Sequence, residues 1–185
     1  MKNIISFVSF LMLLVLLSSC KQEKSLQSYI VESQDKSGFM TIDIPASFIQ
    51  FKSPDVSDDI KESLQSIRKI NLVGLPYQNN KASYEIEKKT IKDILKNSEN
   101  YKSLIGMDVK GMKVDMYYIG NTDSIDELIV FGYSKEFGVG LARILGNGMN
   151  PIKIIEMMKY VKIDPGQFNL QQFNLSFKQK TDSII

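Results

Sequence analysis

The chain has 185 residues, 23 basic and 21 acidic side chains, one cysteine and no histidine. Without histidine, the Ser-His-Asp and Cys-His catalytic systems and histidine-based zinc sites are excluded. A formal net charge of +2 gives no electrostatic signature of nucleic-acid binding. We therefore expect no nucleic-acid partner, no metal and no cofactor.

The first twenty residues carry a targeting pattern. Lys2 is followed by an apolar run without acidic residues, which ends in the small residues of LSSC, Leu17–Cys20. This order is typical of a secretory signal peptide, and LSSC resembles the lipobox of bacterial lipoproteins, in which the cysteine receives diacylglycerol. We predict a lipoprotein signal peptide over 1–19, cleavage between Ser19 and Cys20, and lipid attachment at Cys20. The alternatives are an incidental cysteine in an ordinary signal peptide, or an N-terminal anchor that is never cut.

The rest of the chain divides into a tether, one domain and a tail. Residues 20–37 are polar with a few apolar residues at helical spacing, which predicts a lipidated tether and one marginal short helix. Residues 38–162 have the patterning of a packed domain. Residues 163–185 form a C-terminal extension, in which QFNLQQFNLSF repeats a five-residue unit.

The first half of the domain mixes strands and helices. Alternation in FMTIDIP predicts a half-buried strand over 39–45. Apolar residues four, four and three apart predict an amphipathic helix over 53–70, and INLVGLPY predicts a short strand over 70–77. A second amphipathic helix is predicted over 82–101.

The second half of the domain changes to a period of two. It predicts a meander of about four antiparallel strands, with turns at KG, NTDS and KEFG; the strands are 101–109, 113–120, 126–134 and 139–146. A third helix follows over 150–162, with Asn150 as N-cap and Pro151 at its first position. We predict a single α+β domain with a mostly antiparallel sheet of about five or six strands and amphipathic helices packed mainly on one face.

These elements carry a family resemblance. Their order, and above all SKEFGVGLARILGNGMNPIKIIEMMK over residues 134–159, resembles the family called domain of unknown function 4252. The similarity extends over Leu26–Lys162. It implies a small lipoprotein of a bacterial envelope with one domain, and it supplies no catalytic or ligand-binding residues.

Acidic residues gather in two places, in DVSDD over residues 55–59 and in NTDSIDE over residues 121–127. The first cluster lies where a helix N-terminus favours negative charge, and the second lies in a hairpin turn. We expect both to be structural, and we predict neither catalytic residues nor metal ligands.

Strand 126–134 is apolar on both sides, which an antiparallel sheet covered on one face does not require. Two explanations stay open for the face that carries Tyr117, Ile119, Phe131 and Tyr133. In the first, the N-terminal helix or the C-terminal tail covers these residues and completes the core. In the second, they form an exposed interaction patch for a partner protein, a peptide or lipid.

We therefore expect a non-catalytic interaction or accessory module rather than an enzyme. It would be lipid-anchored in the cell envelope, at the outer membrane facing the periplasm, with the membrane and an envelope protein as partners. The alternatives are a carboxylate-dependent hydrolase acting on cell wall or glycan, and a carrier of a small apolar ligand or lipid. The sequence does not predict an oligomeric state.

Overall fold

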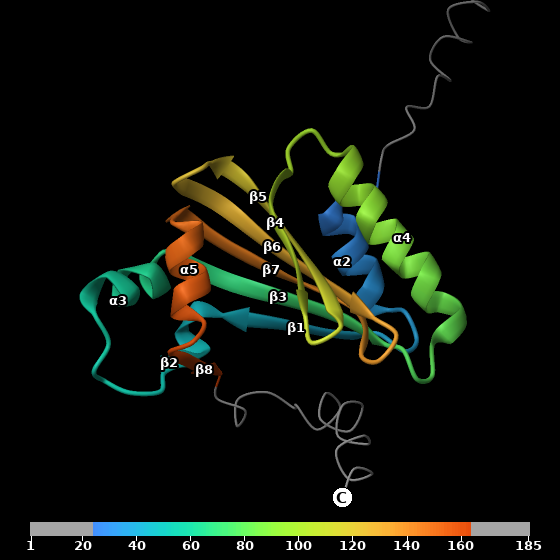
Figure 1. Cartoon of the computed structure of the whole chain (residues 1–185), viewed down its shortest axis with the longest axis horizontal. Helices are drawn as coiled ribbons and strands as arrows, with labels where there is room; N and C mark the ends of the chain where they lie inside the picture. The colour runs from blue at the N-terminus through green and yellow to red at the C-terminus, as the bar shows by residue number, and fades with distance from the viewer. Residues whose placement is uncertain (1–23, 164–185) are drawn as a thin grey trace, which may run out of the picture.

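The computed structural model describes residues 24–163, so Ser19, Cys20 and the extension beyond Ile163 lie outside the described residues. The centre of the fold is an antiparallel sheet of six strands, which are β1 (Met40–Pro45), β3 (Ile67–Pro76), β4 (Lys102–Val109), β5 (Met112–Asn121), β6 (Ser124–Ser134) and β7 (Gly138–Met149). Their order across the sheet is β1-β3-β7-β6-β5-β4 (Figure 1). Two short strands, β2 (Ile49–Phe51) and β8 (Val161–Ile163), form a separate antiparallel ribbon.

Four α-helices pack on this sheet, two on each face. They are α2 (Leu26–Gln34), α3 (Asp58–Gln65), α4 (Lys81–Asn97) and α5 (Pro151–Met157); a 3-10 turn, η1 (Ala46–Phe48), links β1 to β2. Figure 1 shows α2 and α4 together at one end of the molecule, and α3 and α5 together at the other. None of these helices has the length and apolar character that crossing a membrane requires.

Two apolar cores result, one on each face of the sheet. Alternate residues of β3, β6 and β7, such as Val73, Phe131 and Leu141, pack against α2 and α4. The residues between them, such as Ile70, Leu128 and Ile144, pack against α3, α5 and the β2–β8 ribbon. The α+β single-domain class is confirmed, but the helices are divided between the two faces rather than packed mainly on one. The physical reason is that the central strands are apolar on both sides, so each side needs a covering layer.

The meander is confirmed strand by strand. β4 to β7 pair consecutively as antiparallel neighbours. At the predicted KG turn, Lys110 and Gly111 have φ values of 51° and 80°, which is the backbone that a tight hairpin turn with the strand twist requires. The predicted cap of the last helix is also confirmed, because Asn150 Oδ1 accepts from the backbone N–H groups of Ile152 and Lys153.

Several boundaries differ from those predicted. The helix predicted over 53–70 ends at Gln65, because Ile67 already pairs with Gly146 in the sheet. The last helix ends at Met157, and residues 161–163 form β8 instead. The short N-terminal helix is not marginal: α2 buries Leu26, Tyr29 and Ile30 in the core, so the folded domain begins with α2 rather than at residue 38.

Candidate functional site

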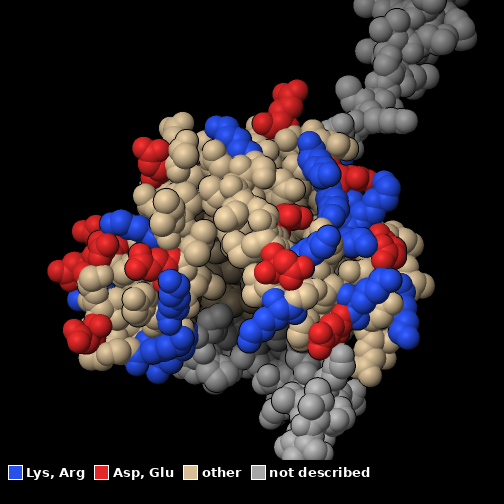
Figure 2. Space-filling view, viewed as in Figure 1, with Lys and Arg blue, Asp and Glu red and all other residues tan. Residues whose placement is uncertain are grey.

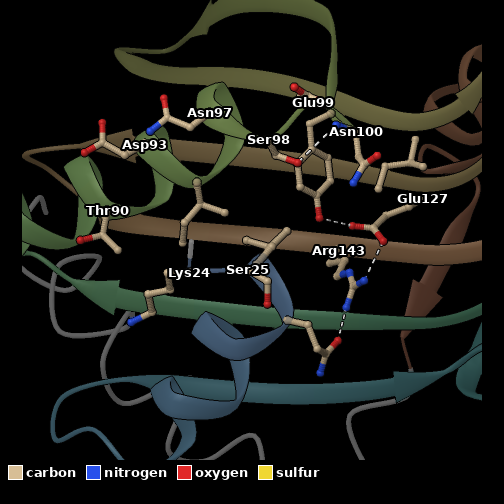
Figure 3. Close-up of a pocket in the computed structure, with 15 residues that line it drawn as sticks. Lys24, Ser25, Thr90, Asp93, Asn97, Ser98, Glu99, Asn100, Glu127 and Arg143 are labelled. Carbon is tan, nitrogen blue, oxygen red and sulfur yellow. Dashed lines mark hydrogen bonds and ion pairs between the residues drawn. The ribbon is translucent and has the colours of Figure 1, made fainter. Parts of the chain in front are cut away.

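A polar cleft of about 770 Å³ lies where the N-terminus of α2 and the C-terminal half of α4 meet the sheet (Figure 3). One wall begins at Lys24, and the other wall is the end of α4 with the loop that leads into β4. The floor is formed by side chains of β5, β6 and β7 on the α2/α4 face. Segments that are far apart in the chain therefore build this surface together.

A hydrogen-bonded ion pair forms the floor of the cleft. Arg143 Nη2 on β7 donates to Glu127 Oε2 on β6 at 2.7 Å, and these side chains are only 13% and 6% exposed. The Tyr101 hydroxyl donates to the other carboxylate oxygen of Glu127 at 2.8 Å, and Arg143 Nη1 donates to Gln27 Oε1. The network thus ties α2, the loop before β4 and two central strands to one another.

The charges of this network are fixed by their surroundings. Burial alone would lower the pKa of Arg143, but the hydrogen bond from its guanidinium to Glu127 and the charge of that carboxylate outweigh burial and raise the pKa. Burial, followed by the charge of Glu127, raises the pKa of Tyr101 well above its usual range. Arg143 therefore stays a cation and Tyr101 stays a hydroxyl donor. Because both oxygens of Glu127 are engaged, the floor is suited to binding rather than to proton transfer.

The walls of the cleft add positively and negatively charged side chains, and they add both hydrogen-bond donors and hydrogen-bond acceptors. The amide side chains of Gln27, Asn97 and Asn100 line it together with Ser98 and Thr90. Of the carboxylates, Asp93 is paired with Lys89 on the same helix. One donor of the floor is unused, since Arg143 Nε is buried and has no hydrogen-bond partner. The cleft therefore offers donors and acceptors without a strong excess of either charge.

The family comparison covers most of the elements that build this cleft, but not the wall formed by residues 24–27. The family model described as a domain of unknown function, DUF4252, matches residues 29–157. The chain belongs to the DUF4252 family. No curated protein and no solved structure gives a significant match. DUF4252 membership thus accounts for the domain from α2 to α5 and supplies no mechanism.

The four residues of the predicted patch share one face of the DUF4252 sheet, but they do not form one exposed surface. Phe131 is fully buried, and Tyr117 and Tyr133 are partly buried and pack against the core that α2 and α4 cover. Lys92 of α4 donates to the Tyr133 hydroxyl at 2.7 Å. Phe131 is therefore a core residue, as the covering-helix interpretation requires. Ile119 is the one member of the four that lines the cleft.

The acidic clusters divide between structural positions and the cleft. Asp58 and Asp59 lie in the first turn of α3, where a hydrogen bond from Ser57 and then one from Lys153 lower the pKa of Asp59. Glu127 was assigned to a turn cluster, but it lies in β6 and shares the α2/α4 face with Ile129 and Phe131 by the ordinary alternation of the strand. The sequence does carry a signal for this site, because two strands that are otherwise apolar each contain a charged residue, Glu127 in one and Arg143 in the other. Within residues 24–163, no three His, Cys, Asp or Glu side chains gather as a metal site would need.

Proposed function

We propose that this protein is a lipid-anchored cell-envelope protein that acts as a non-catalytic interaction module, with the polar cleft as its binding surface. The observation that carries the proposal is the place of the cleft in the chain. Its wall begins at Lys24, four residues after Cys20. Four extended residues span at most about 15 Å. A lipid on Cys20 would hold the cleft close to the membrane surface.

The chemistry of the cleft favours a polar and uncharged partner segment. The amides and hydroxyls that line the cleft match the alternating N–H and C=O groups of a peptide chain. The ion pair of the floor is already ordered by its own hydrogen bonds, so binding would not have to immobilise it. We infer that the partner is a polar segment of another envelope protein, presented near the membrane. We also propose that the protein is anchored in the outer membrane with its domain facing the periplasm.

The geometry supports binding better than hydrolysis. A glycosidase needs two carboxyl groups facing a cleft at roughly 5 to 9.5 Å, one of them able to give a proton. Three carboxylates line the cleft: Glu127 is held by Arg143 and Tyr101, Asp93 is paired with Lys89, and Glu99 is exposed to solvent in the loop after α4. None of the three has the apolar surroundings that would keep a carboxylic acid protonated as a general acid.

Site-specific photo-crosslinking in intact cells tests the proposal. A benzoylphenylalanine replaces Asn97 in the full chain, and the matched control carries it at Lys61 of α3, on the other face of the sheet. We expect a light-dependent adduct with an envelope protein from Asn97 and none from Lys61. The Asn97 adduct should be lost when the floor is replaced by the pair Glu127→Leu and Arg143→Met. The absence of an adduct at Asn97, or an adduct that persists after the floor is replaced, would contradict the proposal.

A further inference from the structure

A second hollow, an apolar groove of about 370 Å³, lies on the opposite face of the sheet from the cleft. Its floor is a row of three glycines on neighbouring strands. Gly74 of β3 is paired with Gly140 of β7, and Gly140 is paired with Gly132 of β6. A β-carbon added at Gly74 would meet nothing within 4 Å. The row carries no side chains of its own; the space above Gly74 is open, whereas the Met112 side chain lies beside Gly132.

The walls of the groove are apolar. Leu72, Ala142, Val130 and Val114 line it, together with Phe137 of the turn between β6 and β7. Figure 2 shows a hollow in the surface between the part of the molecule that carries α3 and α5 and the β4–β5 hairpin. The groove is not closed by any of the described residues.

The apolar surface continues from the groove to the edge of the sheet. Ile105, Met107 and Val109 of β4 are paired with Met116, Val114 and Met112, so they share the groove's face. They are 46%, 37% and 44% exposed, respectively. A soluble domain rarely leaves a continuous apolar surface of this kind uncovered, least of all along an edge strand. This pattern indicates a binding surface with an apolar occupant.

We propose that the occupant is the C-terminal segment of this chain, residues 164–185, which lies across the groove with phenylalanine side chains over the glycine row. The apolar residues of the segment are Phe168, Leu170, Phe173, Leu175 and Phe177, separated by Gln, Asn and Ser. Within each group they are two residues apart, so an extended segment places each group on one side. One irregular residue between Leu170 and Phe173 would bring both groups to the same side. Large rings fit over strands that lack side chains.

The point where the described chain ends supports this occupant. Ile163 is paired with Ile49 in the β2–β8 ribbon, and Ile49 belongs to the core on the groove's face. Leu72 and Ala142 pack against that core and also line the groove, so the two apolar surfaces are continuous.

The distance is short compared with the length of the segment. The ribbon follows β1, whose end at Pro45 is paired with Lys69 of β3. The groove begins at Leu72, about 10 Å beyond Lys69 along β3, and η1 separates Pro45 from the ribbon. The ten residues after Ile163 would span about 33 Å when extended. A segment of the same chain is also present at a high effective concentration, which favours it over a second copy or a free ligand.

A consequence follows for access to the groove. An apolar ligand or peptide would have to compete with the segment to bind there. The cleft lies on the other face, so this inference can fail without affecting the proposed function, and the reverse also holds.

Thiol accessibility in the groove tests the inference. The protein is residues 20–185 with Cys20→Ser, and Val130→Cys supplies the only thiol. In one variant Phe168, Phe173 and Phe177 are replaced by Ser; in the matched control Gln167, Gln171 and Gln172 are replaced by Ser. We expect slow maleimide labelling in the parent and the control, and labelling about tenfold faster in the phenylalanine variant. A reference thiol from Lys110→Cys, at the hairpin tip, should label at one rate in all three.

Two results would overturn the inference. Equally fast labelling of V130C in all three proteins would mean that the groove is open. Equally slow labelling in all three would mean that a different occupant covers the groove. If that occupant is a second copy of the chain, labelling should become faster on dilution; if it is a bound ligand, native mass spectrometry should detect it.

A second variant keeps the inference testable should V130C fold poorly. Gly74→Val fills open space in a strand that favours β-branched residues, so it does not disturb the sheet itself. The valine side chain would block the row of glycines and so displace the C-terminal segment from the groove. We therefore expect tryptic cleavage at Lys178 to become faster. Unchanged cleavage would contradict docking in the groove.

Discussion

The ion pair on the floor of the cleft allows a quantitative test by a double-mutant cycle. Arg143→Met leaves Glu127, whose side chain is 6% exposed, with the Tyr101 hydroxyl as its one hydrogen-bond partner among residues 24–163. Breaking a buried pair on one side costs about 3–5 kcal/mol of unfolding free energy. Glu127→Leu should have a similar effect, because it leaves the buried guanidinium of Arg143 without its counter-charge.

Replacing both residues together should cost much less than either single change. A buried pair that is replaced by apolar residues of similar volume is often neutral or stabilising, and the hydrogen bond from Tyr101 that is lost contributes about 1 kcal/mol. We therefore expect the double variant to lie within about 2 kcal/mol of the parent. The coupling energy between the two positions is then several kcal/mol.

Urea unfolding at neutral pH measures this cycle. With a slope of about 2 kcal/mol per molar urea, each single variant should lower the midpoint by about 2 M, and the double variant by less than half as much. The exposed pair Lys89–Asp93 on α4 is the control, and its coupling should be about 0.5 kcal/mol. A coupling below about 1 kcal/mol between Glu127 and Arg143 would refute the assignment of a buried, interdependent pair.

Three further predictions concern the core, a helix cap and pH. Phe131→Ala should lower the unfolding free energy by about 3–5 kcal/mol, because its ring is fully buried under α2 and α4; an unchanged thermal melt would mean that this face is open. Asn150→Ala should cost about 1 kcal/mol by removing the two hydrogen bonds that begin α5, whereas Asn150→Asp, which keeps the acceptor, should cost little. Burial raises the pKa of Tyr29 above its ordinary value of 10.0, so the folded state keeps a proton that the unfolded state loses. Stability should therefore be constant below pH 10 and fall above it, by about 1.4 kcal/mol per pH unit for each such tyrosine. Tyr29→Phe should flatten that decline in pH-dependent urea unfolding, and an unaltered slope would contradict it.

The local sequence pattern was sufficient to predict those elements in which the hydrophobic period and the turn residues indicate the same structure. The meander, the turn at Lys110 and Gly111 and the cap at Asn150 all follow from residues close in sequence. Ile67 lies in phase with the preceding helix, yet its place is decided by pairing with Gly146, which is distant in the chain. The division of helices between two faces is likewise a tertiary effect, because an amphipathic stripe shows that a helix is covered and not which face of the sheet covers it.

The candidate site was harder to predict than the fold. Glu127 and Arg143 are sixteen residues apart, and they meet because the pairing of β6 with β7 places Arg143 opposite Ile129, the next residue after Glu127 on the same face. The glycine row was not predicted from the sequence. Gly74, Gly132 and Gly140 become one feature when the register aligns them across three strands.

The central claim is that Cys20 holds the cleft at a membrane, and the intact mass of the protein extracted from membranes tests it most directly. The account predicts a chain that begins at Cys20 and carries diacylglycerol on its sulfur. Fragmentation of the N-terminal peptide should place the added mass on Cys20 itself. A chain that still begins at Met1, or one that begins elsewhere with an unmodified thiol at Cys20, would contradict the account.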